Sequence, residues 1–176
     1  MKIKVAPYQT SWKSLFEDEK GRIQEALGNE TLAIYHIGST SVPGLLAKPV
    51  IDIMPVVDDI SRVDLYEKQM NELGYEALGE FGIKGRRYFR KGWNVRTHHV
   101  HVFESRNTHD INRHLAVREY LRNHKQAARQ YGELKEALVQ RYQGDQEAYI
   151  NGKDLFVKDL ERKAMEWYKG DKQSFS

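Results

Sequence analysis

The chain has 176 residues, of which 40% are hydrophobic and 30% charged, and its formal net charge is +3. This balance is typical of one folded domain and not of a disordered chain. The small charge permits nucleotide or nucleic-acid binding without favouring it, and because no nucleic-acid motif appears, nucleic acid is the least expected partner. Cysteine is absent, which excludes disulfides, thiolate metal sites and cysteine nucleophiles. No apolar run reaches membrane-spanning length and the first ten residues lack a signal-peptide core, so we expect a cytoplasmic protein without membrane association.

The first half of the chain alternates between helical and strand patterns. Helical spacing of apolar residues predicts a helix from Trp12 to Leu27, which ends at a glycine. Apolar runs predict buried strands at 34–37 and 50–57. A second helix is expected from about residue 60 to 73, again ended by a glycine, and a short strand at 75–78.

The second half begins with a hairpin and ends in helices. The expected hairpin arms are 86–91 and 95–103, joined around a glycine. Three helices follow, at about 108–121, 125–142 and 146–168.

This order predicts an α+β fold, in which a mixed β-sheet is flanked by helices and followed by a helical C-terminal tail. The sheet core covers about residues 30–105 and the C-terminal helices about 108–170. No repeat or linker divides the chain, so we expect a single domain over 1–176.

A small-residue turn follows the first strand. Gly38, Ser39, Thr40 and Ser41 offer backbone N–H groups and hydroxyls with little side-chain bulk. Such a turn suits the close approach of phosphate. Lys48 is a further candidate phosphate contact. Taken alone, a Gly-Ser pair after a strand is more often an ordinary turn.

Asp52 is an isolated acid in an apolar strand. Burying an unpaired carboxylate is costly, so this side chain needs a charged partner, a metal ion or a proton. Strand alternation places Asp52 and Met54 on one face of the sheet, and Ile51 and Ile53 on the other. Pairing with a nearby arginine or lysine is the simple structural alternative.

Three histidines fall in one predicted strand. Alternation places His99 and His101 on one face and His98 on the other, and residues two apart on a strand lie about 6.6 Å apart. Two imidazoles and a carboxylate suit Zn²⁺, Mn²⁺ or Fe²⁺, and Mg²⁺ only when phosphates and water complete its shell. The alternative is two half-exposed histidines on an edge strand. His36 is either a fourth participant or a core histidine.

Basic residues gather at the first hairpin arm. Alternation separates Arg86 from Arg87, and whichever of them faces the acid and the histidines could bind a polyphosphate through two parallel hydrogen bonds. The alternative is a solvated basic hairpin.

The chain resembles the GrpB family in four blocks, HIGSTSVPGLLAKPVIDI, GRRYFRKG, THHVHVFE and RHLAVREYLRNH. The resemblance implies a fold of the nucleotidyltransferase superfamily, with a sheet like the palm of DNA polymerase beta. In active superfamily members the Gly-Ser turn holds the nucleotide's β- and γ-phosphates, and acids on the sheet hold two Mg²⁺ ions. GrpB-like domains also occur fused to dephospho-CoA kinase, which suggests a CoA-like ligand as an alternative.

Carried over by position, Gly38 and Ser39 match the superfamily's turn and Asp52 matches its first acid. The chain departs from the pattern at Met54, where the second acid is expected, because a thioether cannot replace a carboxylate on Mg²⁺. His99 or His101 occupies the position of the third acid. The standard two-metal mechanism is therefore not expected here.

The leading hypothesis is a nucleotidyltransferase-like enzyme that acts on a nucleoside triphosphate or other phosphorylated small molecule. Asp52, His99 and His101 are its candidate catalytic and metal-binding residues, and the divalent metal is Mg²⁺, Mn²⁺ or Zn²⁺. The residues expected at the phosphates are Gly38, Ser39, Thr40, Ser41, Lys48, Arg86 and Arg87. The alternatives are a non-catalytic nucleotide- or CoA-binding module, and a hydrolase or oxygenase with an Asp/His/His metal site.

Overall fold

The structure is a computed structural model that describes residues 4–174. The ends of the predicted 1–176 domain and the first residues of the segment searched for a signal peptide lie outside it. The described residues form two compact units. We call residues 10–37 and 50–111 the sheet unit, and residues 4–9, 38–49 and 112–174 the helical unit, and we describe each by itself. The single-domain organisation stays a prediction.

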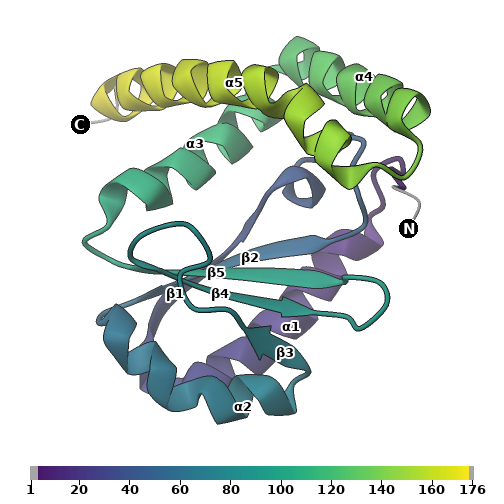
Figure 1. Ribbon diagram of the computed structural model, residues 1–176. Coiled ribbons are helices and arrows are strands. Elements are labelled where there is room, and N and C mark those ends of the chain that lie inside the picture. The colour runs from purple at the N-terminus through teal and green to yellow at the C-terminus, as the bar shows by residue number, and fades with distance from the viewer. Residues whose placement is uncertain (1–3, 175–176) are drawn as a thin grey trace. The chain divides into compact units, whose positions relative to one another are not determined.

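The sheet unit contains a five-stranded sheet in the order β1-β2-β5-β4-β3 (Figure 1). β2 and β5 are parallel and every other neighbouring pair is antiparallel, so the sheet is mixed. Because β5 lies between β2 and β4, the last strand of the chain is central in the sheet. The strands are β1 (Thr31–Ile37), β2 (Ile51–Val57), β3 (Tyr75–Ala77), β4 (Arg86–Lys91) and β5 (His98–Glu104).

One face of this sheet packs against α1 (Ser11–Leu27). On that face His36 of β1 stacks on Phe16 of α1 with ring centroids 4.7 Å apart. His36 pairs with Ile53 of β2, and Ile53 is fully buried. Asp52, which alternates with Ile53, therefore belongs to the opposite face.

Two sequence expectations in the sheet unit need correction. The helix expected at 60–73 is a 3₁₀ segment at Ile60–Tyr66 followed by the short α2 (Glu67–Glu72). The Asp59 carboxylate accepts hydrogen bonds from the Ser61 backbone N–H at 3.0 Å and its hydroxyl at 2.6 Å, which tightens the first turn.

The second hairpin arm begins at His98 rather than at residue 95, because a loop intervenes. Gly92 has a φ of 110°, and a Cβ placed there would lie 2.0 Å from the Val95 carbonyl oxygen. Only glycine fits this close approach.

The helical unit contains most of α3 (Thr108–Asn123), with α4 (Lys125–Tyr142) and α5 (Gln146–Ser174). The C-terminal helices are confirmed, although the last one extends beyond the predicted end at 168. Its core joins the 38–49 segment to all three helices through the buried side chains of Val42, Leu45, Leu121, Tyr131 and Leu160. The α+β class and the helical tail are thus confirmed. Within residues 4–174, every helix is too short or too polar to cross a bilayer.

Candidate functional site

Asp52, His99 and His101 lie together on the sheet face opposite α1, and we call them the acid–imidazole cluster. The parallel register places Asp52 beside His99. His99 Nδ1 lies 3.4 Å and His101 Nε2 3.2 Å from the same carboxylate oxygen, Oδ1. Among the described residues, Oδ2 has no hydrogen-bonding or ionic partner. The cluster is partly open, because the Asp52 side chain is 26% exposed and that of His99 is 29% exposed.

The two imidazoles keep Asp52 ionised. Burial by itself would raise the pKa of the Asp52 carboxyl, but hydrogen bonds from His101 and then His99 outweigh burial and lower the pKa well below its usual range. The carboxylate is therefore an anion at any physiological pH, with one oxygen occupied by the histidines.

Arg86 determines which nitrogen of His101 carries the proton. Its Nη1 lies 3.3 Å from His101 Nδ1. A guanidinium group can only donate, so Nδ1 must accept this hydrogen bond. The ring proton then sits on Nε2, which donates to Asp52 Oδ1 at 3.2 Å. In this arrangement His101 is a hydrogen-bond donor to the acid.

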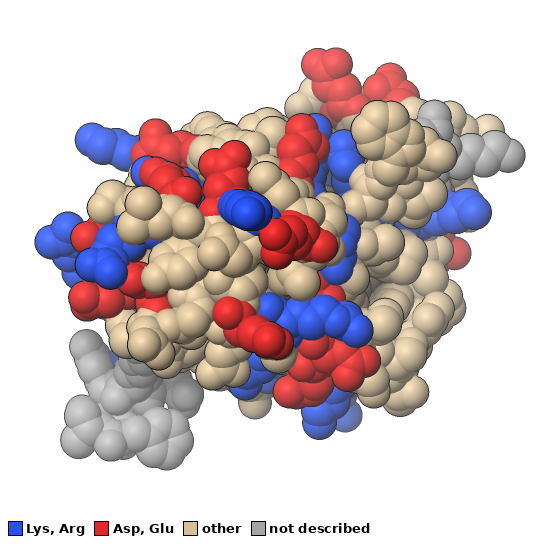
Figure 2. Space-filling view, turned by 90° about the horizontal axis from the view of Figure 1, so that it is seen from below, with Lys and Arg blue, Asp and Glu red and all other residues tan. Residues whose placement is uncertain are grey.

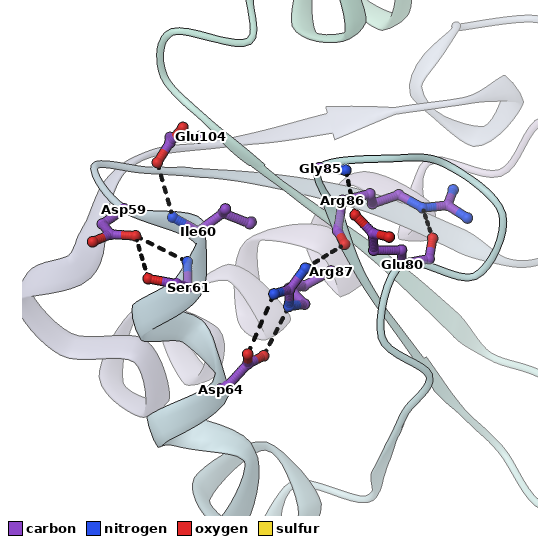
Figure 3. A network of polar contacts seen from close by, with 9 residues as sticks. All are labelled: Asp59, Ile60, Ser61, Asp64, Glu80, Gly85, Arg86, Arg87 and Glu104. Atoms are coloured by element: carbon purple, nitrogen blue, oxygen red, sulfur yellow. Dashed lines mark hydrogen bonds and ion pairs between the residues drawn. The ribbon is translucent and has the colours of Figure 1, made fainter.

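Arg86 is itself held in place by the loop that precedes β4. Its Nε donates to the Glu80 carbonyl oxygen at 3.2 Å (Figure 3). Its Nη2 donates to the Phe81 carbonyl oxygen at 2.8 Å, and the residue is only 6% exposed. The sequence predicted a phosphate contact for Arg86. The structure gives Arg86 these partners within the protein, and its role toward phosphate stays a prediction.

The donor atoms of the acid–imidazole cluster determine which metal ions it could hold. A nitrogen that carries a proton has no lone pair for a metal, so the bond from Arg86 opposes metal binding through His101 Nε2. No group of three or more His, Asp and Glu side chains in residues 4–174 is arranged to hold a metal ion. The arrangement does not fit a Zn²⁺ or Fe²⁺ site with two histidines and an acid. It does fit Mg²⁺ or Mn²⁺, which accept one carboxylate when phosphates and water complete the shell.

Met54 follows Asp52 on the same face of β2 and is fully buried. Pairing with Tyr35 of β1 fixes its place in the sheet. Two residues after Asp52, the protein thus has a buried thioether.

Two predicted site residues do not join Asp52. Arg87 points to the other face of β4, where its guanidinium pairs with Asp64 at 2.8 and 3.3 Å (Figure 3). His36, stacked on Phe16, is a core histidine on the α1 face, which is the alternative considered for it.

The small-residue turn belongs to the helical unit, where Ser39–Ser41 form one 3₁₀ turn after Gly38. Gly38 has a φ of 74°, a conformation that favours glycine. Lys135 of α4 donates to the Ser39 hydroxyl and, at 3.1 Å, to the Leu46 carbonyl. Lys135 is only 3% exposed, so a buried cation supports the partly exposed Ser39.

The rest of this turn is held from within the helical unit. Arg122 of α3 donates to the Ser41 carbonyl oxygen through Nε at 3.0 Å and Nη2 at 2.8 Å. Thr40 and Ser41 are buried, which leaves Gly38 and Ser39 as the accessible part of the turn. Lys48 instead places its ammonium 4.7 Å from the centre of the Tyr149 ring.

A second polar cluster lies on the α1 face of the sheet, and we call Glu19, Tyr75, Lys91 and His98 the buried acid cluster. Glu19 accepts from the Tyr75 hydroxyl at 2.7 Å and from Lys91 at 2.5 Å, and it is 1% exposed. His98 Nε2 lies 4.0 Å from Glu19 Oε2. Burial would raise the pKa of the Glu19 carboxyl, but the hydrogen bonds from Lys91 and Tyr75 lower it overall.

Sequence reasoning missed Glu19 and Lys135, although both gave a signal. Glu19 continues the buried helical spacing of Phe16 and Ile23, and Lys135 lies between Tyr131 and Leu138 of α4. A charged residue inside an apolar helical stripe indicates a buried partner.

On the face shown in Figure 2, basic and acidic side chains are intermixed. This agrees with the small net charge of +3.

Comparison with known proteins identifies relatives over nearly the whole chain. The family model described as GrpB protein matches residues 2–163. UPF0157 protein YqkA of Bacillus subtilis is 44% identical over 169 residues, which are 96% of this chain and 49% of that protein. A UPF0157 protein of Pseudomonas aeruginosa is 41% identical over 163 residues, which are 89% of this chain and 65% of that protein. This chain thus spans less than two thirds of either relative.

A solved structure shares the fold. The crystal structure of conserved protein GrpB from Enterococcus faecalis is 45% identical and superposes with a TM-score of 0.91. The match covers 94% of this chain and 99% of that one.

Proposed function

The chain belongs to the GrpB family, and on that premise we propose that it binds a nucleoside triphosphate with one divalent metal ion at Asp52 and transfers a nucleotidyl group to a small acceptor. The observation that carries the proposal is the state of Asp52. Its carboxylate is ionised and partly exposed, both imidazoles contact Oδ1, and Oδ2 has no partner among the described residues. The nucleotidyltransferase fold that the family resemblance implies adds support.

Asp52 would hold Mg²⁺ or Mn²⁺ together with phosphate oxygens and water. Such an ion neutralises phosphate charge and orients the phosphates for in-line attack. His101 would keep the carboxylate ionised and oriented through its Nε2–H, and Arg86 would keep His101 in that tautomer. In the transfer, the oxygen of an acceptor hydroxyl would form a bond to the α-phosphorus and lose its proton to water, the bond between the α-phosphorus and the bridging oxygen to the β-phosphate would break, and pyrophosphate would leave.

We also propose that the turn at Gly38 and Ser39 binds phosphate, and this proposal rests on the contacts of the turn within the helical unit. Ser39 is partly exposed, and its hydroxyl accepts from the buried Lys135, so the hydroxyl proton is directed elsewhere and can be donated to a phosphate oxygen. Ser39→Ala should then weaken phosphate binding without unfolding the protein.

The test is a calorimetric titration with each common nucleoside triphosphate, in Mg²⁺ and in EDTA. We expect binding only with the metal, and a loss of at least about tenfold in Asp52→Asn, which is about 1.4 kcal/mol. Asp64→Asn is the matched control, because Asp64 is a 56% exposed carboxylate paired with Arg87. Wild-type affinity in Asp52→Asn would refute the proposed role of Asp52.

A second candidate is a non-catalytic nucleotide- or CoA-binding module, which the buried Met54 at the second acid position favours. It predicts that Asp52→Ala leaves ligand affinity almost intact and that no pyrophosphate is released with any acceptor. A thermal-shift screen of nucleotides, CoA compounds and divalent metals would identify the ligand to use.

A further inference from the structure

Phe81 is exposed and conformationally strained. It lies in the loop between β3 and β4, is 55% exposed, and has a φ of 46°. Non-glycine residues rarely adopt this left-handed conformation, and those that do cluster at ligand-binding sites. Glycine at this position would expose no apolar side chain and would adopt this backbone conformation without strain.

The surrounding loop holds Phe81 firmly. Arg86 Nη2 donates to the Phe81 carbonyl oxygen at 2.8 Å. Next to Phe81, the Glu80 carboxylate accepts from the Gly85 backbone N–H at 2.6 Å, as Figure 3 shows. The Tyr88 backbone N–H donates to the Gly79 carbonyl at 2.8 Å. Phe81 is therefore presented by an ordered loop.

The Phe81 ring stacks on Tyr88 of β4, with centroids 5.1 Å apart and planes inclined by 7°. Tyr88 thus covers one face of the ring, while Phe81 as a whole stays 55% exposed. Tyr88 in turn contacts His101 and His99, with ring centroids 5.2 and 5.8 Å apart. The stack thus adjoins the acid–imidazole cluster within the same unit.

A cation also lies near this ring. The Arg90 guanidinium carbon is 6.0 Å from the Phe81 centroid, and Arg90 pairs with Glu76 at 2.9 Å. An aromatic face beside a guanidinium group suits a planar heteroaromatic ring, which stacks on the aromatic face and accepts hydrogen bonds at its edge.

We infer that the outer face of Phe81 is a nucleobase platform, on which the base of the ligand stacks while its phosphates reach Asp52. The inference rests on the proposed function and adds the base-recognition element to it. Stacking is tolerant of base identity, so this platform predicts similar affinity for purine and pyrimidine triphosphates, with the larger purines somewhat favoured.

The test compares nucleoside triphosphates with inorganic tripolyphosphate, both with Mg²⁺, by calorimetry. Phe81→Ala should weaken nucleotide binding by at least about fivefold and leave tripolyphosphate binding unchanged. Phe81→Trp should retain nucleotide binding and add fluorescence that the nucleotide quenches. Leu65→Ala, which removes a 72% exposed side chain from the same unit, should change neither affinity.

The outcomes separate this inference from the function it rests on. If the wild type binds neither probe, the proposed function fails. If it binds nucleotide with the same affinity in Phe81→Ala, or binds tripolyphosphate as tightly as nucleotide, the platform is refuted and the phosphate site stands. Concentration-dependent dimerisation that Phe81→Ala abolishes, with unchanged nucleotide affinity, would also overturn the platform, because Phe81 would then contact a second copy.

Discussion

Two acids, Glu19 of α1 and Asp52 of β2, lie on opposite faces of the sheet in opposite circumstances. Glu19 faces the sheet from α1, is buried, and accepts hydrogen bonds from Lys91, the Tyr75 hydroxyl and Arg22. Asp52 is partly exposed, and two imidazoles contact one of its oxygens. His98 belongs to the first cluster and His99 to the second, so one strand serves both. The difference teaches how to separate a structural carboxylate from one that can bind a ligand: the first has all its partners inside the protein, and the second has an oxygen left over.

The largest effect is expected from Glu19→Ala. It leaves Lys91 and the Tyr75 hydroxyl without their buried acceptor, and removing one partner of a buried pair costs about 3–5 kcal/mol. Denaturant unfolding should show this loss, whereas Glu25→Ala, an exposed acid on the same helix, should change the free energy of unfolding little. Equal losses in the two variants would contradict a structural role for the buried acid cluster.

Arg86→Met should have the next largest effect. It removes the donor to the Glu80 and Phe81 carbonyls and to His101, and should lower the free energy of unfolding by about 1–3 kcal/mol. Imidazole ¹⁵N NMR should show the His101 proton on Nε2 in the wild type. In the variant it should show a mixture of the Nε2–H and Nδ1–H tautomers. Arg87→Met is the matched control and should leave the His101 spectrum unchanged. A proton on Nδ1 in the wild type would exclude the proposed tautomer.

Asp52→Asn should destabilise the protein by only about 1 kcal/mol, because its partners are imidazoles at a partly exposed site. The same substitution should weaken metal-dependent nucleotide binding by at least about tenfold. A loss of stability as large as that of Glu19→Ala would mean that Asp52, too, is primarily structural.

The smallest effect is expected in how the stability difference between wild type and Asp52→Asn depends on pH. The folded-state pKa of Asp52 is lowered from its ordinary value of 3.8, so the stabilisation is fully present above that pH and is lost as the pH falls through the folded pKa. The difference between wild type and Asp52→Asn should therefore stay constant from pH 8 to about 5 and shrink only below pH 3.8. A change near pH 6.5 would indicate that a histidine, not the acid, dominates.

Strand alternation predicted much of the acid–imidazole cluster. The spacing of His99 and His101 placed both imidazoles on one face, and the lone acid in an apolar strand indicated a partner. The sequence could not predict that β2 and β5 are parallel neighbours, because register between distant strands depends on the whole sheet. It also could not predict the tautomer, since Arg86 reaches His101 only when the loop before β4 holds its guanidinium group.

The helices show a different limit. Apolar spacing predicted α1 and α4, but Glu19 and Lys135 passed as ordinary surface charges because charged residues on helices usually face water. Their partners, Tyr75 with Lys91 and Ser39 with Leu46, lie far away in the chain. The helical stripe indicates that such a charge is buried, but the identity of its partner depends on tertiary contacts, which local periodicity does not reveal.

The central position of β5 also bears on how the protein folds. β5 lies between β2 and β4, and its parallel pairing with β2 closes a chain segment that contains α2, β3 and β4. Such non-local pairings form slowly, because the entropy of closing the intervening chain is lost before the contacts are gained. Asp52 and His99 therefore cannot meet until β5 enters the sheet. We expect ligand-binding competence to appear in the last step of refolding, after the β4–β5 hairpin has formed.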